Sequence, residues 1–200
     1  MINRARRWEP EKFAAVADRL HAECGADIVL VGAAGDDTPQ VAAAMHSPYN
    51  DYFGKTSLPE LVELLKTCDL LIGVDSGVTH MAARAGARTL ALFGPSNPQA
   101  WQPFNSVIVR AAPECSPCNY VDHRLGAREG CAARTCMKLI TVDQVVDHAL
   151  AMLKGQSVDS APMTPKLPDA PGIERIRILG LPVSVITYDQ WMALIDSWVK

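Results

Sequence analysis

The stretch LLIGVDSGVTH, residues 70–80, predicts a buried strand that runs directly into the start of a helix. Its first five residues form an apolar run of strand length, and Asp75 and Ser76 are residue types that cap helix N-termini. Gly77 lets backbone approach a ligand closely. Because a helix start presents free amide N–H groups and a positive dipole end, the stretch predicts an anion site, with His80 as a further donor. Asp-Ser-Gly on its own is more typical of an ordinary capped helix.

Helices and strands alternate along the rest of the sequence up to residue 153. Apolar, β-branched runs predict further buried strands at 27–32, 88–93 and 106–110. Amphipathic patterns and capping residues predict helices at 9–24, 38–46, 57–68, 76–86 and 141–153. The segment 47–55 is expected to be a loop. This alternation is typical of an α/β domain with a largely parallel sheet.

Three of the predicted strands end in polar or glycine-rich turns, at residues 32–37, 74–80 and 93–98. Open parallel sheets bind ligands at the carboxyl ends of their strands, so these turns are expected to line one cleft. The sequence contains no G-x-G-x-x-G, Walker A or G-x-S-x-G motif. The common dinucleotide-binding, P-loop and hydrolase functions therefore lose support.

Composition places the chain among globular proteins. Its 200 residues are 48% hydrophobic and carry a formal net charge of −3, which implies neither nucleic acid nor an anionic membrane surface as a partner. No apolar run approaches the roughly 20 residues of a bilayer span, and the first seven residues lack the apolar segment of a secretory signal. A cytoplasmic location is expected.

Changes in composition predict three parts. Residues 1–155 form the α/β domain, which ends after a helix capped by Thr141. Residues 156–172 are rich in Pro, Ser, Asp and Ala and are typical of an extended linker. Residues 173–200 are expected to form a short α/β tail of two strands and a helix. They are too few to bury a core alone, so they dock on the main domain, pair with another chain or begin a second domain.

Four of the six cysteines form a cluster with the spacing C-x2-C-x12-C-x4-C: Cys115, Cys118, Cys131 and Cys136. This spacing is close to that of structural zinc sites. A reducing compartment argues against disulfides as the default. Free thiols and a zinc site remain as alternatives, and free thiols are favoured. No metal and no cofactor is expected.

The order of these motifs resembles glycosyltransferase family 9, the lipopolysaccharide heptosyltransferases, over roughly residues 4–153. The resemblance is carried by Arg6-Arg7-Trp8, GKTSLPEL at 54–61, CDLLIGVDSGVTHMAA at 68–83, LALFGPS at 90–96, Trp101-Gln-Pro and the cysteine stretch. It implies a GT-B fold of two Rossmann-like halves, of which this chain is similar to the C-terminal half. In this family that half holds the nucleotide sugar, usually ADP-heptose.

The same resemblance implies roles for particular residues. The diphosphate and the donor sugar would be contacted by Asp75, Ser76, Gly77 and His80, with Val78 and Thr79 forming the helix start. The family's basic residue near the phosphates would fall on Arg6 or Arg7. Asp36 or Asp37 would stand near the ribose, although a solvated loop carboxylate is nearly as typical there. No catalytic residue is assigned, because the family supplies the acceptor base from its N-terminal half.

Residues 173–200 resemble the opening of the N-acetylmannosaminyltransferase family that acts on polyprenyl-diphosphate-linked N-acetylglucosamine.

The leading hypothesis is the donor-binding half of an inverting glycosyltransferase, with a nucleotide-sugar donor and a lipopolysaccharide or surface-glycan acceptor. It would work in the cytoplasm or at the cytoplasmic face of the inner membrane, and without its N-terminal half it would bind donor but not turn over. The alternatives are a non-catalytic nucleotide-binding or scaffolding module and, last, a zinc-ribbon interaction protein.

Overall fold

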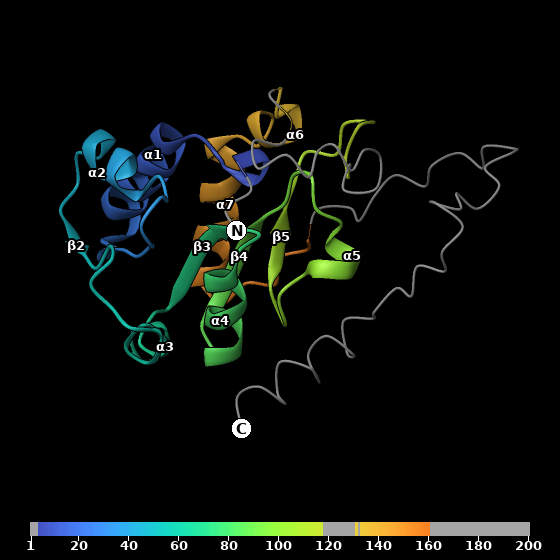
Figure 1. Cartoon of the computed structure of the whole chain (residues 1–200). Helices are drawn as coiled ribbons and strands as arrows, with labels where there is room; N and C mark the ends of the chain where they lie inside the picture. The colour runs from blue at the N-terminus through green and yellow to red at the C-terminus, as the bar shows by residue number, and fades with distance from the viewer. Residues whose placement is uncertain (1–3, 118–130, 132, 161–200) are drawn as a thin grey trace, which may run out of the picture.

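The computed structural model describes residues 4–117, 131 and 133–160, and it shows parallel β-sheets with helices on both sides (Figure 1). One sheet pairs β1 (Ile28–Leu30) with β2 (Tyr49–Asp51). The other has the order β3-β4-β5, with strands Leu70–Val74, Arg88–Leu92 and Val107–Val109. All of these pairs are parallel, so the prediction of an α/β domain with a parallel sheet is confirmed.

Five helices match the predicted ones to within a few residues: α1 (Pro10–Cys24), α2 (Thr38–Ala44), α3 (Leu58–Lys66), α4 (Gly77–Ala85) and α7 (Val142–Leu153). Their starts follow from local hydrogen bonds. Ser57 and Glu60 form a reciprocal capping box before α3, and Thr141 and Gln144 form another before α7. Short helices that were not predicted are η1 (Arg4–Arg6), α5 (Pro98–Trp101) and α6 (Thr135–Lys138).

Strand β2 differs from the prediction, which made 47–55 a loop. Its three residues are exposed and polar or aromatic, so they carry none of the apolar pattern that marks a buried strand. They form a strand because their backbone pairs in register with β1, as in Ile28 with Tyr49. This pairing depends on a neighbour 21 positions away and leaves no local signal.

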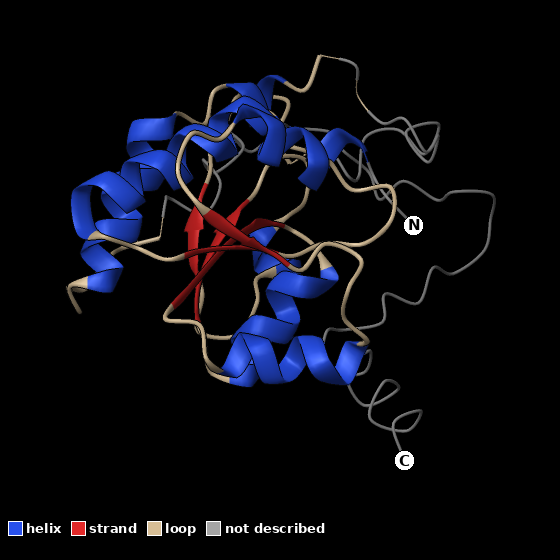
Figure 2. Cartoon of the chain, turned by 90° about the vertical axis from the view of Figure 1, so that its left-hand side faces the viewer, coloured by secondary structure: helices blue, strands red, loops and turns tan. Residues whose placement is uncertain are grey.

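The second sheet is the middle layer of three (Figure 2). Side chains alternate across a strand, and in β3 Leu70, Ile72 and Val74 pack into the main core with residues of α1 and α7. Leu71 points the other way, into a smaller core with residues of α3 and α4. The carboxyl edge of this sheet is thus held between two packed faces.

The chain leaves α7 and runs back beside β5. Val158 packs against the main core, and the backbone N–H of Ile108 donates to Ser160 Oγ at 3.1 Å. The first residues of the predicted linker therefore contact the domain. Residues 161–172 and the predicted second-domain fragment at 173–200 lie outside the described residues, so these assignments stay predictions. Among the described helices, none is both long and apolar enough to cross a membrane.

Candidate functional site

The turn between β3 and α4 is held by the hydroxyl of Thr79. This fully buried hydroxyl accepts a hydrogen bond from the Ser76 N–H at 3.1 Å and lies 2.6 Å from the carbonyl oxygen of Val74, to which it donates. Ser76 is the N-cap of α4, in extended backbone conformation. The Thr79 side chain therefore shapes the helix start from inside. Val78 also packs inward, against the core beneath α3 and α4.

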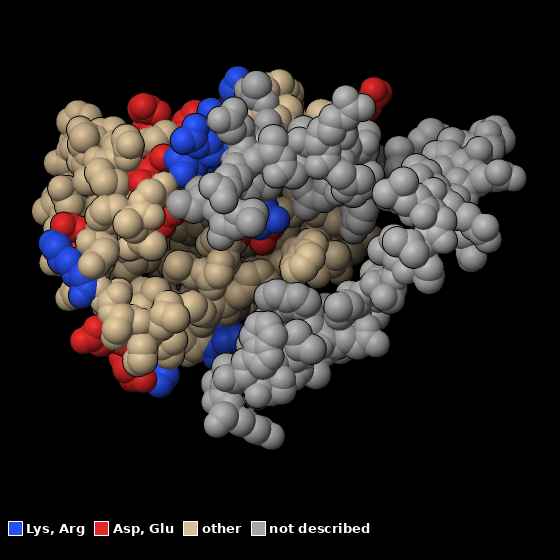
Figure 3. Space-filling view, viewed as in Figure 1, with Lys and Arg blue, Asp and Glu red and all other residues tan. Residues whose placement is uncertain are grey.

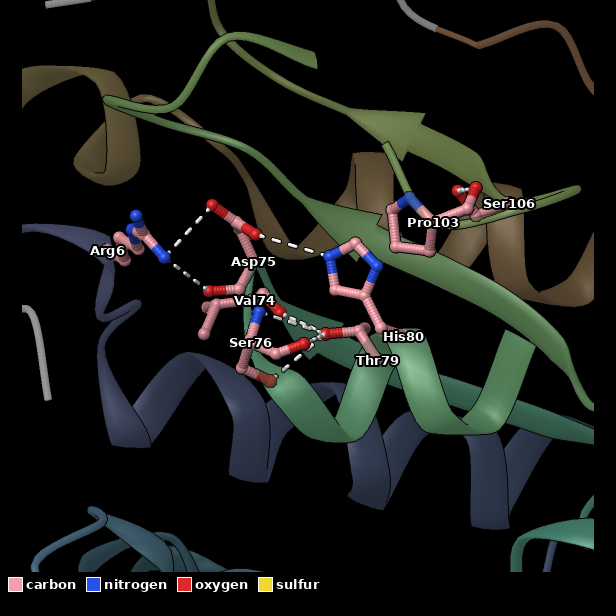
Figure 4. Close-up of polar contacts among 8 residues, drawn as sticks. All are labelled: Arg6, Val74, Asp75, Ser76, Thr79, His80, Pro103 and Ser106. Carbon is pink, nitrogen blue, oxygen red and sulfur yellow. Dashed lines mark hydrogen bonds and ion pairs between the residues drawn. The ribbon is translucent and has the colours of Figure 1, made fainter. Parts of the chain in front are cut away.

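Asp75 lies between two cationic or ionisable side chains at this helix start (Figure 4). Its carboxylate is only 6% exposed. Arg6 Nη1 is 3.2 Å from Asp75 Oδ2 and 3.5 Å from the Asp75 carbonyl oxygen. His80 Nε2 is 3.8 Å from Asp75 Oδ1, which is an electrostatic contact rather than a hydrogen bond. The three side chains form one polar cluster, with Arg6 and His80 partly exposed.

The pKa of the Asp75 carboxyl reflects opposing effects. Burial raises this pKa, but interactions with His80 and Ser96 and the charge of Arg6 together outweigh burial and hold the pKa below its ordinary value of 3.8. Ser96 is fully buried and lies beside the carboxylate, although its hydroxyl makes no hydrogen bond of good geometry. Asp75 is thus ionised near neutral pH and gives the cluster a fixed negative centre.

Gly77, the first residue of α4, faces open space. It is exposed, and a Cβ built on it would meet no heavy atom within 4 Å. Nothing described in the protein therefore requires a glycine there. The first amides of a helix lack intrahelical acceptors, so this space is bordered by free N–H groups. The arrangement suits an anionic ligand that approaches the helix start closely.

The turn after β1 binds the second of the two adjacent arginines. Arg7 forms an ion pair with Asp37 through Nη1 and donates from Nη2 to the carbonyl oxygen of Gly35 at 2.7 Å. The carboxylate of Asp36 instead accepts from the Ala33 N–H at 2.7 Å and stays within its own turn. Arg6 and Arg7 therefore hold different turns, 75–80 and 32–37, at neighbouring places.

Arg7 and Asp37 also line a shallow cleft of about 460 Å³, together with Arg4, Trp8 and Arg134. On the face of the molecule that Figure 3 shows, basic side chains gather in the upper middle, with acidic side chains beside them. Of the two carboxylates predicted near a ribose, the structure brings Asp37 to this cleft and leaves Asp36 in its turn.

The turn after β4 packs into the protein interior. A Cβ on Gly94 would lie 2.3 Å from Met137 Sδ and 3.0 Å from Cys136 Sγ, so only glycine allows α6 to approach this closely. The carbonyl oxygen of Gly94 accepts from Ser116 Oγ at 2.6 Å, and Ser116 Oγ accepts from Arg110 Nη2 at 3.1 Å. Sequence reasoning missed Arg110, whose only local signal is a charge directly after an apolar strand.

The cysteine cluster is only partly described. Cys115 and Cys131 are free thiols, exposed and half-buried respectively, Cys136 is buried, and Cys118 lies outside the described residues. Within the described part of the chain, no three potential ligands come together around a metal position. The choice between free thiols and zinc, which needs Cys118, stays a prediction.

Comparison of the sequence with models of known families identifies the family of this chain. The model of the family described as glycosyltransferase family 9 (heptosyltransferase) matches residues 3–127, more than half of the chain. The chain belongs to this family. The resemblance in motif order is therefore confirmed, and so is the predicted fold class, an α/β Rossmann-like half of a GT-B glycosyltransferase fold.

Named relatives and solved structures agree with this assignment. Lipooligosaccharide heptosyltransferase 2 of Campylobacter jejuni is 28% identical over 161 residues, which is 75% of this chain and 47% of that protein. Lipopolysaccharide heptosyltransferase 3 of Escherichia coli is 32% identical over 108 residues, 52% of this chain and 32% of that protein. The E. coli ADP-heptose lipopolysaccharide heptosyltransferase II structure superposes with a TM-score of 0.63 at 25% identity, covering 76% of this chain and 44% of that one.

A family 9 glycosyltransferase structure from Veillonella parvula gives a TM-score of 0.60 at 26% identity, covering 76% of this chain and 43% of that one. The chain thus spans less than half the length of each of these four proteins. What it shares with these structures is one Rossmann-like half and its flanking helices.

Proposed function

We propose that this chain is the donor-binding half of an inverting glycosyltransferase. It holds a nucleoside diphosphate sugar, ADP-heptose in our proposal, for transfer to a lipopolysaccharide or related surface-glycan acceptor at the cytoplasmic face of the inner membrane. The observation that carries the proposal is the open start of α4: Gly77 faces open space, and two residues before it Asp75 is in contact with Arg6 and His80. The E. coli relative whose name includes ADP-heptose supports the choice of donor.

The helix start is suited to the leaving group. When the glycosidic bond to the nucleoside diphosphate breaks, negative charge develops on the diphosphate oxygens. The first amides of α4, the positive end of its dipole and the guanidinium of Arg6 stabilise that charge in place. His80, one turn into the helix, adds a second donor from the other side of Asp75.

Asp75 has a different role from its neighbours, because a buried carboxylate repels a diphosphate. We assign it to orienting Arg6 and His80 and to accepting a hydrogen bond from a hydroxyl of the donor sugar. Its Oδ2 atom is paired with Arg6 Nη1 at 3.2 Å but makes no hydrogen bond of good geometry within the protein, so it has acceptor capacity left for a sugar hydroxyl that reaches it. Val78 contributes its backbone N–H group, while the N–H of Thr79 faces the Ser76 side chain in the capping box of α4.

Ribose recognition is assigned to the cleft at 32–37. Asp37 is the better candidate, because it lies at the cleft wall whereas Asp36 accepts from its own turn. The acceptor proton must be removed by a base close to the acceptor hydroxyl. We assign that base to the part of the relatives' length that this chain does not span, so the chain binds donor without efficient transfer.

Calorimetry with ADP, UDP and GDP tests the donor site. We expect ADP to bind most tightly, and His80→Ala to weaken ADP binding about tenfold, the effect of losing one hydrogen bond to a charged group. His148→Ala is the matched control, because His148 lies on α7 and its Nδ1 is bonded to its own helix at Gln144. Equal and negligible binding of all three nucleotides by the unmodified chain would refute the proposed function.

A further inference from the structure

A positive charge lies buried at the carboxyl end of β5. Arg110 is 5% exposed, and only its Nη2 is bonded, to Ser116 Oγ; its Nε and Nη1 are buried without hydrogen-bond partners. Among the described residues no carboxylate forms an ion pair with it. Burial lowers the pKa of Arg110 and nearby Cys136 raises it, but a guanidinium titrates so far above neutral pH that the charge remains.

The hydrogen bond to Ser116 does not by itself explain why a charged residue is buried at position 110. Ser116 Oγ uses its own hydrogen to donate to the Gly94 carbonyl, so this bond to the turn after β4 does not itself require a cation. Within the described part of the chain no carboxylate neutralises this charge, and such a buried charge is destabilising. An apolar side chain of similar size would avoid both the desolvation and the two nitrogens, Nε and Nη1, that make no hydrogen bond. The positive charge itself is therefore the feature to be explained.

The register of the sheet places Arg110 on the same edge as the donor site. Val74 pairs with Leu92, and Leu92 pairs with Val109, so these three residues lie side by side across the sheet. Asp75 and Arg110 each follow directly after one of them, at the carboxyl ends of β3 and β5. The Asp75 N–H bonds to Leu92 and the Phe93 N–H to Val109 across the same edge. Two strand spacings put the Asp75 and Arg110 backbones about 10 Å apart.

We propose that Arg110 is a buried counter-charge for the diphosphate of the donor, acting through the packed turn 93–98 without touching the ligand. The proposal deepens the proposed function and rests on it. Charges inside a protein interact more strongly than charges in water, and buried ones are little screened by salt. Arg110 thus raises the positive potential at the start of α4, where Arg6 is already neutralised in part by Asp75.

The test compares Arg110→Met and Arg110→Lys for binding of ADP and of uncharged adenosine by calorimetry, with melting temperatures of each variant. For Arg110→Met we expect ADP affinity to fall on the order of tenfold, which is the Coulomb interaction of two unit charges at an effective dielectric constant of about 20 when the roughly 10 Å between the two backbones is taken as their separation. Adenosine affinity stays unchanged. Arg110→Lys retains most of the ADP affinity, because it retains the charge.

Stability gives an independent readout. Removing the unpaired charge is expected to raise the melting temperature of Arg110→Met by about 2–4 °C, whereas a purely structural role predicts a decrease. Arg88→Met is the matched control: Arg88 begins β4 at the opposite edge of the same sheet, so its loss leaves ADP affinity unchanged. Arg110→Gln provides a second neutral variant, expected to bind ADP as weakly as Arg110→Met.

Several results would overturn the proposal. They are unchanged ADP affinity in Arg110→Met, equal weakening of ADP and adenosine, or Arg110→Lys as weak as the neutral variants. A neutral variant that melts well below the unmodified chain would show a structural role instead. If the unmodified chain binds ADP but the neutral variants bind it equally well, only this inference fails; if the unmodified chain does not bind ADP, the proposed function fails.

Discussion

Gly77 and Gly94 follow neighbouring strands at the same edge of one sheet, but they are glycines for opposite reasons. A Cβ added at Gly77 would have no heavy atom within 4 Å, whereas a Cβ added at Gly94 would lie 2.3 Å from Met137 Sδ. One turn keeps space open toward the outside, and the other is packed against α6. The comparison separates a glycine that borders open space, where we propose that the ligand lies, from a glycine that lets two parts of the core pack closely.

Replacing the packed glycine should give the largest effect. Gly94→Ala forces a methyl group against Met137 and Cys136, which are both buried, so the turn or α6 must shift. We expect the free energy of unfolding to fall by about 1–3 kcal/mol, the usual cost of overpacking a core. Urea unfolding followed by circular dichroism measures this. An unchanged free energy would mean that Met137 moves aside freely and that the two glycines do not differ.

Replacing the open glycine should affect binding instead. Gly77→Ala puts a methyl group into the space in front of the helix start, so ADP affinity is expected to fall by about tenfold, or about 1.4 kcal/mol. Stability should stay level or rise by up to about 1 kcal/mol, because alanine is the better helix residue. Calorimetry and urea unfolding on the same sample separate the two. Full ADP affinity in Gly77→Ala would remove the distinction between the turns.

The smallest expected effect concerns the charge that borders the open turn. The folded-state pKa of Asp75 lies below its ordinary value of 3.8, so its ionised form stabilises the fold above that pH. This contribution is lost as the pH falls through the folded-state pKa. Asp75→Asn should therefore unfold more easily at pH 7 and show a shallower loss of stability toward pH 2. Parallel pH profiles for Asp75→Asn and the unmodified chain would contradict the assignment.

Some structural features of this protein can be predicted from short stretches of its sequence. Strand Leu70–Val74, the helix caps at Ser57 and Thr141 and the start of α4 were predicted correctly. They depend on apolar periodicity and on hydrogen bonds between residues three or four positions apart, which a sequence shows directly. The order of the motifs likewise indicated the family, because that order is a property of the sequence itself.

Other features depend on residues that meet only in the folded chain. Arg6 reaches Asp75 across 69 positions and Arg7 reaches Asp37 across 30, so their separate tasks were not distinguishable in the motif Arg-Arg-Trp. The sequence alone predicted the strands β1, β3, β4 and β5 and the starts of the five longer helices, and it led to the hypothesis of an anion site at residues 75–80. Tertiary structure decided which arginine lies against Asp75, which glycine faces open space and that Arg110 is buried. The physical reason is that burial and ion pairing depend on distances in space, which local sequence does not contain.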